Sequence, residues 1–220
     1  MRFADRRDAG RRLAARLVRL RGSDPVVVGL PRGGVPVAFE VARALDAPLD
    51  VLVVRKLGVP FQPELAMGAI GEGGALVVDD DVVRRAGVSP VALARIAARE
   101  RATLEDRLRR LRRGRPAVPL AGRTVVVVDD GIATGSTARV ACRVARDRGA
   151  ARVVLAVPVA PAGWESVLRD AADELVAVAT PEPFEAVGAW YDDFSPTTDD
   201  EVVADLARAR QPTPPVIPPG

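Results

Sequence analysis

The 220-residue sequence contains no histidine and a single cysteine, Cys142. Without histidine, no mechanism that needs an imidazole is open to the chain, which excludes Ser–His hydrolysis and most zinc chemistry. One cysteine excludes an intrachain disulfide and any Cys-rich metal site. Because Cys142 falls within a predicted helix, we expect it to behave as a small buried hydrophobic residue.

Aromatic residues are also scarce, at 4% of the chain, although 48% of the residues are hydrophobic. The core must therefore be built mainly from Val, Leu and Ala. No apolar run approaches the length needed to span a membrane, and the first residues, MRFADRRDAGRR, lack the apolar stretch of a signal peptide. These absences predict a cytoplasmic protein that does not contact membranes.

The charges nearly balance, with 32 Lys and Arg against 29 Asp and Glu and a formal net charge of +3. This balance does not require a nucleic-acid partner, which we regard as unlikely from sequence. Many arginines fall in two stretches with helical character, Arg6–Arg21 and Arg84–Arg115. The favoured interpretation of each is a solvated helix face, and an anion-facing surface is the alternative.

Short β-branched runs alternate with segments of helical period, which predicts an α/β fold with a parallel-sheet core flanked by helices. Expected strands lie near Val26–Gly29, Leu49–Val54, Ala75–Val78, Thr124–Val128, Arg152–Val157 and Glu174–Val178. Expected helices cover Ala4–Arg19, Val35–Leu45, Pro90–Arg113, Ser136–Arg148 and Asp199–Arg210. Residues 58–74 predict a long loop or a short hairpin. We expect a single domain over residues 1–210 and a disordered Pro-rich tail over 211–220.

One segment combines a buried strand with a loop suited to binding an anion. Val125–Val128 is apolar throughout, as a central strand should be, and it runs into Asp129 and Asp130. A helix is expected to begin at Ser136 or Thr137, so free backbone N–H groups and hydroxyls surround a small concavity. The partial positive charge of a helix N-terminus favours a dianionic phosphate there.

The two aspartates predict a second kind of contact at the same strand end. Carboxylates accept hydrogen bonds from paired hydroxyls and repel phosphate, so the ligand should carry both a diol and a phosphate. A Walker-type loop is excluded because no lysine stands in the segment. The alternative is an ordinary strand-to-helix turn with an aspartate cap.

The whole segment Val125–Ala138, VVVVDDGIATGSTA, resembles the signature of type I phosphoribosyltransferases. The resemblance implies that Asp129 and Asp130 hold the ribose hydroxyls of phosphoribosyl pyrophosphate (PRPP) and act as the catalytic acids. It also implies a 5′-phosphate site formed by Ala133, Thr134, Gly135, Ser136 and Thr137. Mg²⁺ would be held mostly by substrate oxygens, with Asp129 and Asp130 as the possible protein ligands.

A second loop, in Val26–Gly34 (VVVGLPRGG), follows the same logic at another strand end. A bare Arg-Gly-Gly turn is common, but this one matches the family's pyrophosphate loop in position. The resemblance implies that Arg32, Gly33 and Gly34 bind pyrophosphate, with a strained or cis peptide near Arg32–Gly33. Arg55 and Lys56 follow the next strand, where they either reach the pyrophosphate or simply flank the strand end.

The resemblance extends over about Val26–Val203 and includes a subgroup of uncharacterised bacterial phosphoribosyltransferases. Pro60–Val78 corresponds to the flexible loop that closes over the reacting centre in this family. Ala133 stands where 6-oxopurine enzymes carry an aspartate, as it does in adenine enzymes. Glu64 or Glu72 is a weak candidate for a replacement carboxylate.

The segment over residues 181–202, PEPFEAVGAWYDDFSPTTDDEV, is rich in aromatic residues. The resemblance implies a hood at about residues 180–198, in which Phe184, Trp190 and Tyr191 contact a base. The alternative is that these aromatics pack a small subdomain or a dimer contact. Homodimers are common in the family, so a homodimer is a further expectation.

The expected function is transfer of ribose 5-phosphate from PRPP to a nitrogen acceptor, expected to be a nucleobase, with Mg²⁺-assisted release of pyrophosphate. The main alternative is a regulatory protein that senses PRPP without chemistry. Two less favoured functions are RNA binding through the arginines and a phosphate-dependent reaction on a ribosyl substrate. The sequence does not name the acceptor.

Overall fold

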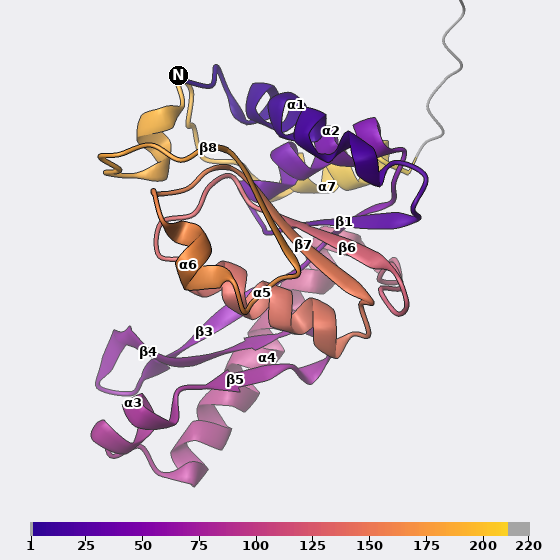
Figure 1. The fold of residues 1–220 in the computed structure, drawn as a ribbon. Helices are drawn as coiled ribbons and strands as arrows, with labels where there is room; N and C mark the ends of the chain where they lie inside the picture. The colour runs from indigo at the N-terminus through magenta and orange to yellow at the C-terminus, as the bar shows by residue number, and fades with distance from the viewer. Residues whose placement is uncertain (1, 211–220) are drawn as a thin grey trace, which may run out of the picture.

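The computed structural model describes residues 2–210, and its core is a five-stranded parallel sheet in the order β2-β1-β6-β7-β8 (Figure 1). The strands are β1 (Pro25–Gly29), β2 (Leu49–Val51), β6 (Thr124–Val128), β7 (Arg152–Val159) and β8 (Glu174–Ala179). Strands β1, β6 and β7 are almost wholly buried because helices cover both faces of the sheet. The predicted fold class is confirmed.

Helices cover the two faces of this sheet in separate groups. α1 (Arg6–Leu17), α2 (Gly34–Leu45) and α7 (Asp199–Arg208) lie on one face, and α5 (Ser136–Asp147) and α6 (Trp164–Leu168) lie on the other (Figure 1). Alternate residues of β6 enter the two cores, with Val126 in one and Val127 in the other. At Gly10 of α1, an added Cβ would lie 2.8 Å from the carbonyl oxygen of Val37, so the absence of a side chain permits close packing on α2.

A second, antiparallel sheet projects from this core with the order β3-β4-β5 (Figure 1). It consists of β3 (Val54–Val59), β4 (Gln62–Gly71) and β5 (Leu76–Val78). It is accompanied by the short helix α3 (Asp80–Arg85) and the long helix α4 (Pro90–Arg112), and these elements form what we call the second lobe. Short 3-10 turns cover Val18–Leu20, Glu72–Gly74 and Val187–Trp190.

One strand prediction at the border of the core and the second lobe is wrong. The expected strand Leu49–Val54 is divided, because β2 ends at Val51 and β3 begins at Val54. Leu52 and Val53 are both buried but belong to different cores, so the apolar run continues where the strand does not. The region 58–74 agrees with the hairpin, which was one of its two predicted alternatives, because β3 and β4 pair antiparallel there. One of its glycines, Gly68, lets β4 approach β5: an added Cβ would lie 2.3 Å from the carbonyl oxygen of Val77.

The remaining helix and strand predictions agree with the structure to within a few residues, while the short helices α3 and α6 were not predicted.

Cys142 is buried in the core as expected, and burial raises the pKa of its thiol to about 12. The predicted tail over residues 211–220 lies outside the described residues. Across residues 2–210, no helix combines the length and apolar character that crossing a bilayer requires.

A buried ion network joins the second lobe to the core. The Nε atom of Arg112, at the end of α4, lies 2.9 Å from the Oδ1 atom of Asp50 in β2, and these side chains are only 7% and 1% exposed. Nη1 of Arg112 also lies 2.5 Å from Oε1 of Glu72, whose other oxygen lies 3.2 Å from Arg148, the residue that follows α5. Because two arginines engage Glu72, it is not the free acid–base carboxylate that we considered from sequence.

We predict that Arg112→Met will lower the free energy of unfolding by about 3–5 kcal/mol, because it leaves Asp50 as a buried charge without its cation. The measurement is urea denaturation followed by circular dichroism. Arg109→Met is the matched control, since Arg109 lies on the same helix with its side chain 68% exposed. Equal unfolding midpoints for the two variants would contradict a structural role for the network.

Candidate functional site

The predicted phosphate loop connects β6 to α5. Asp129 and Asp130 directly follow β6 at its carboxyl edge, which is where ligands bind in open parallel sheets. α5 begins at Ser136, and Gly135, with a φ of +78°, precedes it. The side chains of Thr134, Ser136 and Thr137 are exposed, and the hydroxyls of Thr134 and Ser136 lie 3.3 Å apart. Hydroxyls and free backbone amides therefore gather at the N-terminus of a 12-residue helix.

The second predicted loop lies beside the first because β1 pairs with β6. The peptide bond between Pro31 and Arg32 is cis, one residue before the position that the sequence analysis named. The two loops touch at Gly33, where an added Cβ would lie 2.0 Å from Oδ2 of Asp130. At Gly34 an added Cβ would lie 2.7 Å from the carbonyl oxygen of Val128. Glycine is therefore required at both positions for the loops to approach as closely as they do.

The acid pair is held in an environment that disfavours its full ionisation. Burial, together with the neighbouring charge of Asp130, raises the pKa of Asp129 well above its ordinary value. Burial also raises the pKa of Asp130, and the hydrogen bond from Arg6 opposes this rise. The backbone N–H of Asp130 donates to Oδ1 of Asp129 over 2.9 Å. Two carboxylates this close, with elevated pKa values, are typical of a functional site.

An arginine from the first helix completes this corner of the site. Nε of Arg6 donates to Oδ2 of Asp130 over 2.8 Å, and its Nη1 donates to the carbonyl oxygen of Ser195 over 2.8 Å. Its guanidinium carbon lies 3.9 Å from the centre of the Phe194 ring. The solvated helix face that the sequence favoured is therefore wrong for Arg6. No local signal pairs it with an aspartate 124 residues away.

Of the three predicted base contacts, Tyr191 is placed for a different role. Its side chain is 2% exposed and its ring centre lies 5.4 Å from that of Phe3. Its hydroxyl donates to the backbone carbonyl oxygen of Asp130 over 2.5 Å, so it helps to hold the acid pair in place. Because the side chain is buried, its ring is not open to a base. Phe184 and Trp190 are half-buried at the same hood.

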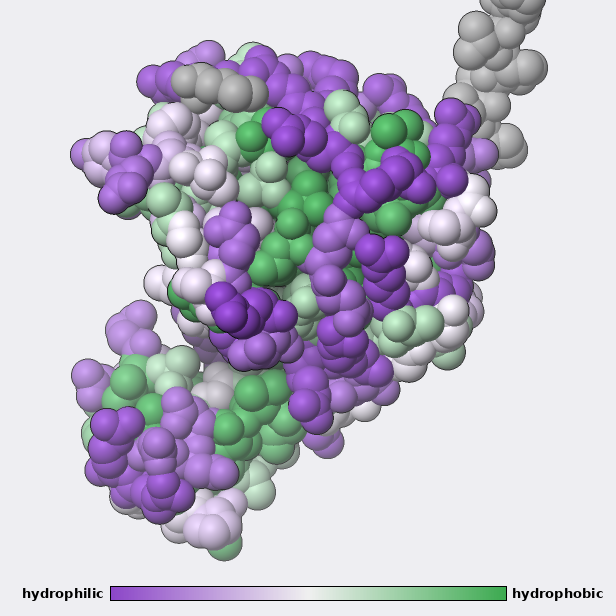
Figure 2. Space-filling model, viewed as in Figure 1, coloured by the Kyte–Doolittle hydropathy of each residue, from purple (hydrophilic) through white to green (hydrophobic). Residues whose placement is uncertain are grey.

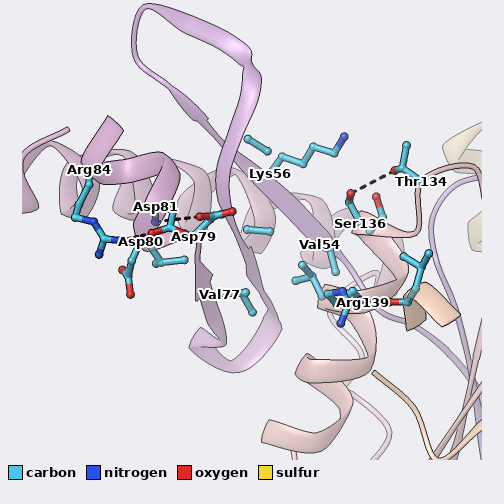
Figure 3. A pocket seen from close by; sticks show the side chains of 17 residues that line it. Val54, Lys56, Val77, Asp79, Asp80, Asp81, Arg84, Thr134, Ser136 and Arg139 are labelled. Carbon is cyan, nitrogen blue, oxygen red and sulfur yellow. Dashed lines mark hydrogen bonds and ion pairs between the residues drawn. The ribbon is translucent and has the colours of Figure 1, made fainter. Parts of the chain in front are cut away.

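Arg55 and Lys56 are neighbours in β3, but their side chains lie in different surroundings. Arg55 lies 2.6 Å from Glu100 of α4, which holds it within the second lobe. Lys56 is exposed and extends toward Thr134 and Ser136 of the phosphate loop (Figure 3). Of this pair, Lys56 is thus the residue that faces the candidate site.

A cleft of about 810 Å³ separates the second lobe from the phosphate loop and α5. The space-filling view shows the second lobe set apart from the upper body by a notch (Figure 2). The floor of the cleft is apolar and includes Val54, Ala69 and Val140. Its polar rim has Lys56 and the loop hydroxyls on one side and Asp79–Asp81 with Arg84 on the other (Figure 3).

Helix α4 also brings a cation near the second loop. Burial lowers the pKa of Arg107; the nearby Asp199 opposes this effect, while the charges of Arg32 and Arg55 add to it. Mutual lowering between arginines means that their positive charges lie close together. Whether the arginine-rich helix faces an anion, which is the alternative given from sequence, stays a prediction.

We predict that Asp129→Asn will stabilise the protein at neutral pH by about 1 kcal/mol, or roughly 2–4 °C in melting temperature. Because the folded-state pKa of Asp129 is raised, the wild type loses stability as the pH rises from the ordinary value of 3.8 through the folded pKa. The gain of the variant should therefore shrink as the pH falls toward that ordinary value. Thermal unfolding between about pH 4 and 8 measures it.

The control is Asp170→Asn, which changes an exposed acid outside the phosphate loop and should show no gain that grows with pH. A uniform shift of melting temperature in Asp129→Asn at every pH would contradict the proposed origin of the effect.

Comparison with known proteins is consistent with this geometry. Residues 4–176 match the family described as "Phosphoribosyl transferase domain". Two Mycobacterium tuberculosis proteins, from strains CDC 1551 and H37Rv, each named "Putative phosphoribosyl transferase", are 58% identical over 209 residues. The match covers 95% of this chain and 47% of theirs, so the chain spans about half the length of these relatives.

A solved structure supports the same relationship. The crystal structure of TT1426 from Thermus thermophilus superposes with a TM-score of 0.83 at 50% sequence identity, covering 94% of this chain and 99% of that one. Its match to nearly the full described fold shows that the core and the second lobe occur together in both proteins. The chain belongs to the phosphoribosyl transferase domain family.

Proposed function

We propose that the protein binds PRPP and transfers its ribose 5-phosphate to a nitrogen acceptor, releasing pyrophosphate. The observation that carries the proposal is the contact between the two loops at Gly33 and Asp130. This contact places an acid pair between a helix N-terminus on one side and an Arg-Gly-Gly turn on the other. A ligand with a phosphate, a diol and a second anionic group in that order would match the arrangement.

Each part of the ligand is assigned to the group that suits its chemistry. The 5′-phosphate is bound by the amides and hydroxyls of residues 133–137, at the positive end of α5. Asp129 and Asp130 accept hydrogen bonds from the ribose hydroxyls. Pyrophosphate is bound by Arg32 and the amides of Gly33 and Gly34, with Lys56 as a further cation.

The reaction breaks the bond between ribose C1 and the pyrophosphate oxygen and forms a bond from C1 to the acceptor nitrogen. The pyrophosphate leaves with the electron pair, and the acceptor nitrogen releases its proton. Positive charge develops on the ribose in between, so catalysis depends on positioning and on stabilising the leaving group. Arg32 supplies charge at the leaving group, and Arg107 adds to the local positive field. The protein needs no covalent nucleophile for this chemistry.

Mg²⁺ fits this arrangement as a partner of the substrate. Within residues 2–210, no cluster of three metal-ligating acids, cysteines or histidines offers a protein cage. Asp129 and Asp130 provide hard carboxylate oxygens of the kind that Mg²⁺ accepts alongside substrate phosphates. When bound, the ion would neutralise the departing pyrophosphate.

A nucleobase is the acceptor that we propose. Phe184 and Trp190 are half-buried and pack against a cluster that includes Tyr191, whose hydroxyl contacts the backbone of Asp130. An aromatic base can stack on such a ring while its nitrogen faces the ribose. Ala133 provides no carboxylate beside the acceptor, so proton transfer to solvent or to another group would accompany the reaction.

We predict that PRPP with Mg²⁺ will bind the wild type, and that Asp130→Asn will weaken binding about 10- to 100-fold, because charge-assisted hydrogen bonds to the ribose are lost. Isothermal titration calorimetry measures both affinities. Asp170→Asn should bind like the wild type. No binding of PRPP to the wild type would contradict the proposal.

Catalysis requires a separate measurement. We expect pyrophosphate release when PRPP, Mg²⁺ and members of a panel of purines, pyrimidines and simple amines are combined with the wild type. Tight PRPP binding without release across the whole panel would instead support the alternative of a PRPP-sensing regulatory protein.

A further inference from the structure

Arg6 lies where three segments remote in sequence meet. Its helix is fixed at this end, because Asp5 caps α1 by accepting a hydrogen bond from the backbone N–H of Asp8 over 2.7 Å. From there the Arg6 side chain reaches Asp130 of the phosphate loop and Ser195 of the hood. The site of an added Cβ on Gly33 also lies 3.1 Å from Nε of Arg6. The guanidinium therefore contacts or borders both predicted loops and the hood.

The ion pair between Arg6 and Asp130 is largely shielded from water. The two side chains are 11% and 16% exposed, and the N–O distance is 2.8 Å. Such a pair is not a solvent-exposed surface pair, and removing one partner leaves a poorly solvated charge behind. By comparison, Arg11 on the same helix is 55% exposed and lies 3.8 Å from Asp8.

The contacts of Asp130 determine which of its oxygens can meet a ligand. Oδ2 is enclosed by Nε of Arg6 and by the backbone of Gly33. The carboxylate therefore keeps one orientation, in which Oδ1 is left to accept a ribose hydroxyl. The positive charge of Arg6 also offsets part of the repulsion between the acid pair and an approaching polyanion.

The same guanidinium connects Asp130 to the acceptor side of the site. Nη1 of Arg6 donates to the carbonyl oxygen of Ser195, and the guanidinium stacks on the ring of Phe194. Tyr191 adds a second connection from the hood through its hydrogen bond to the carbonyl oxygen of Asp130. The hood and the ribose acid are thus held to each other through Arg6 and Tyr191.

We propose that Arg6 is a positioning residue of the ribose subsite, which aims the Asp130 carboxylate at the ribose diol and holds the hood against it. This inference rests on the proposed function, because it assumes that the acid pair binds a ribose. Arg6 acts on the substrate through Asp130: it borders the pyrophosphate loop at Gly33, but its hydrogen bonds go to Asp130 and Ser195.

The test compares three probes by isothermal titration calorimetry, each with Mg²⁺: PRPP, ribose 5-phosphate and inorganic pyrophosphate. For Arg6→Ala we expect a loss of about 10- to 100-fold in affinity for the two ribose-containing probes, as for other charge-assisted hydrogen bonds. Affinity for pyrophosphate should change by less than about twofold, and added methylguanidinium should restore part of the loss. Arg11→Ala should match the wild type for all three probes.

Arg6→Lys keeps the positive charge but loses the planar guanidinium that reaches Asp130 and Ser195 together, so it should fall between the wild type and Arg6→Ala. If Arg6→Ala does not fold, the same comparison is made with Arg6→Lys. Equal losses for pyrophosphate and for the ribose probes, or no loss for any probe, would overturn the inference. Failure of the wild type to bind any probe would instead overturn the proposed function, and this inference with it.

Discussion

Parallel pairing of β1 with β6 is the constraint on which the candidate site depends. It places the ends of two strands that are about 100 residues apart in the chain side by side, so that both following loops open at one edge of the sheet. Gly33 and Gly34 permit the resulting contact, because any side chain there would collide with Asp130 or with the backbone of β6. The acid pair, the Arg-Gly-Gly turn and the N-terminal end of α5 then become contiguous at this edge.

This arrangement places like charges together. Asp129 and Asp130 are adjacent and shielded, while Arg107 lies near Arg32 and Arg55. Burial and mutual charge make full ionisation of the acid pair less favourable in the protein than in water. Carboxylates with raised pKa values in such surroundings are typical of functional sites.

The fold and two of its loops could be predicted from sequence because their signals are local. Residues 125–138 carry an apolar strand, an acid pair and a helix start within fourteen positions. The role of Arg6 could not be predicted in this way, since its partner lies 124 residues away and one arginine of a basic helix resembles the next. The undivided strand Leu49–Val54 was predicted wrongly for a related reason. An apolar run indicates that Leu52 and Val53 are buried, but it does not indicate that they are buried in two different cores.

The ion network around Glu72 also limits how the second lobe could alter the site. Glu72 follows the end of β4 and is held by Arg112 of α4 and by Arg148, which follows α5, so the base of the β3–β4 hairpin is joined both to the second lobe and to the core. Phe61, at the opposite end, is 72% exposed. Any change in the width of the cleft would therefore require bending along the hairpin, with the largest displacement at its tip.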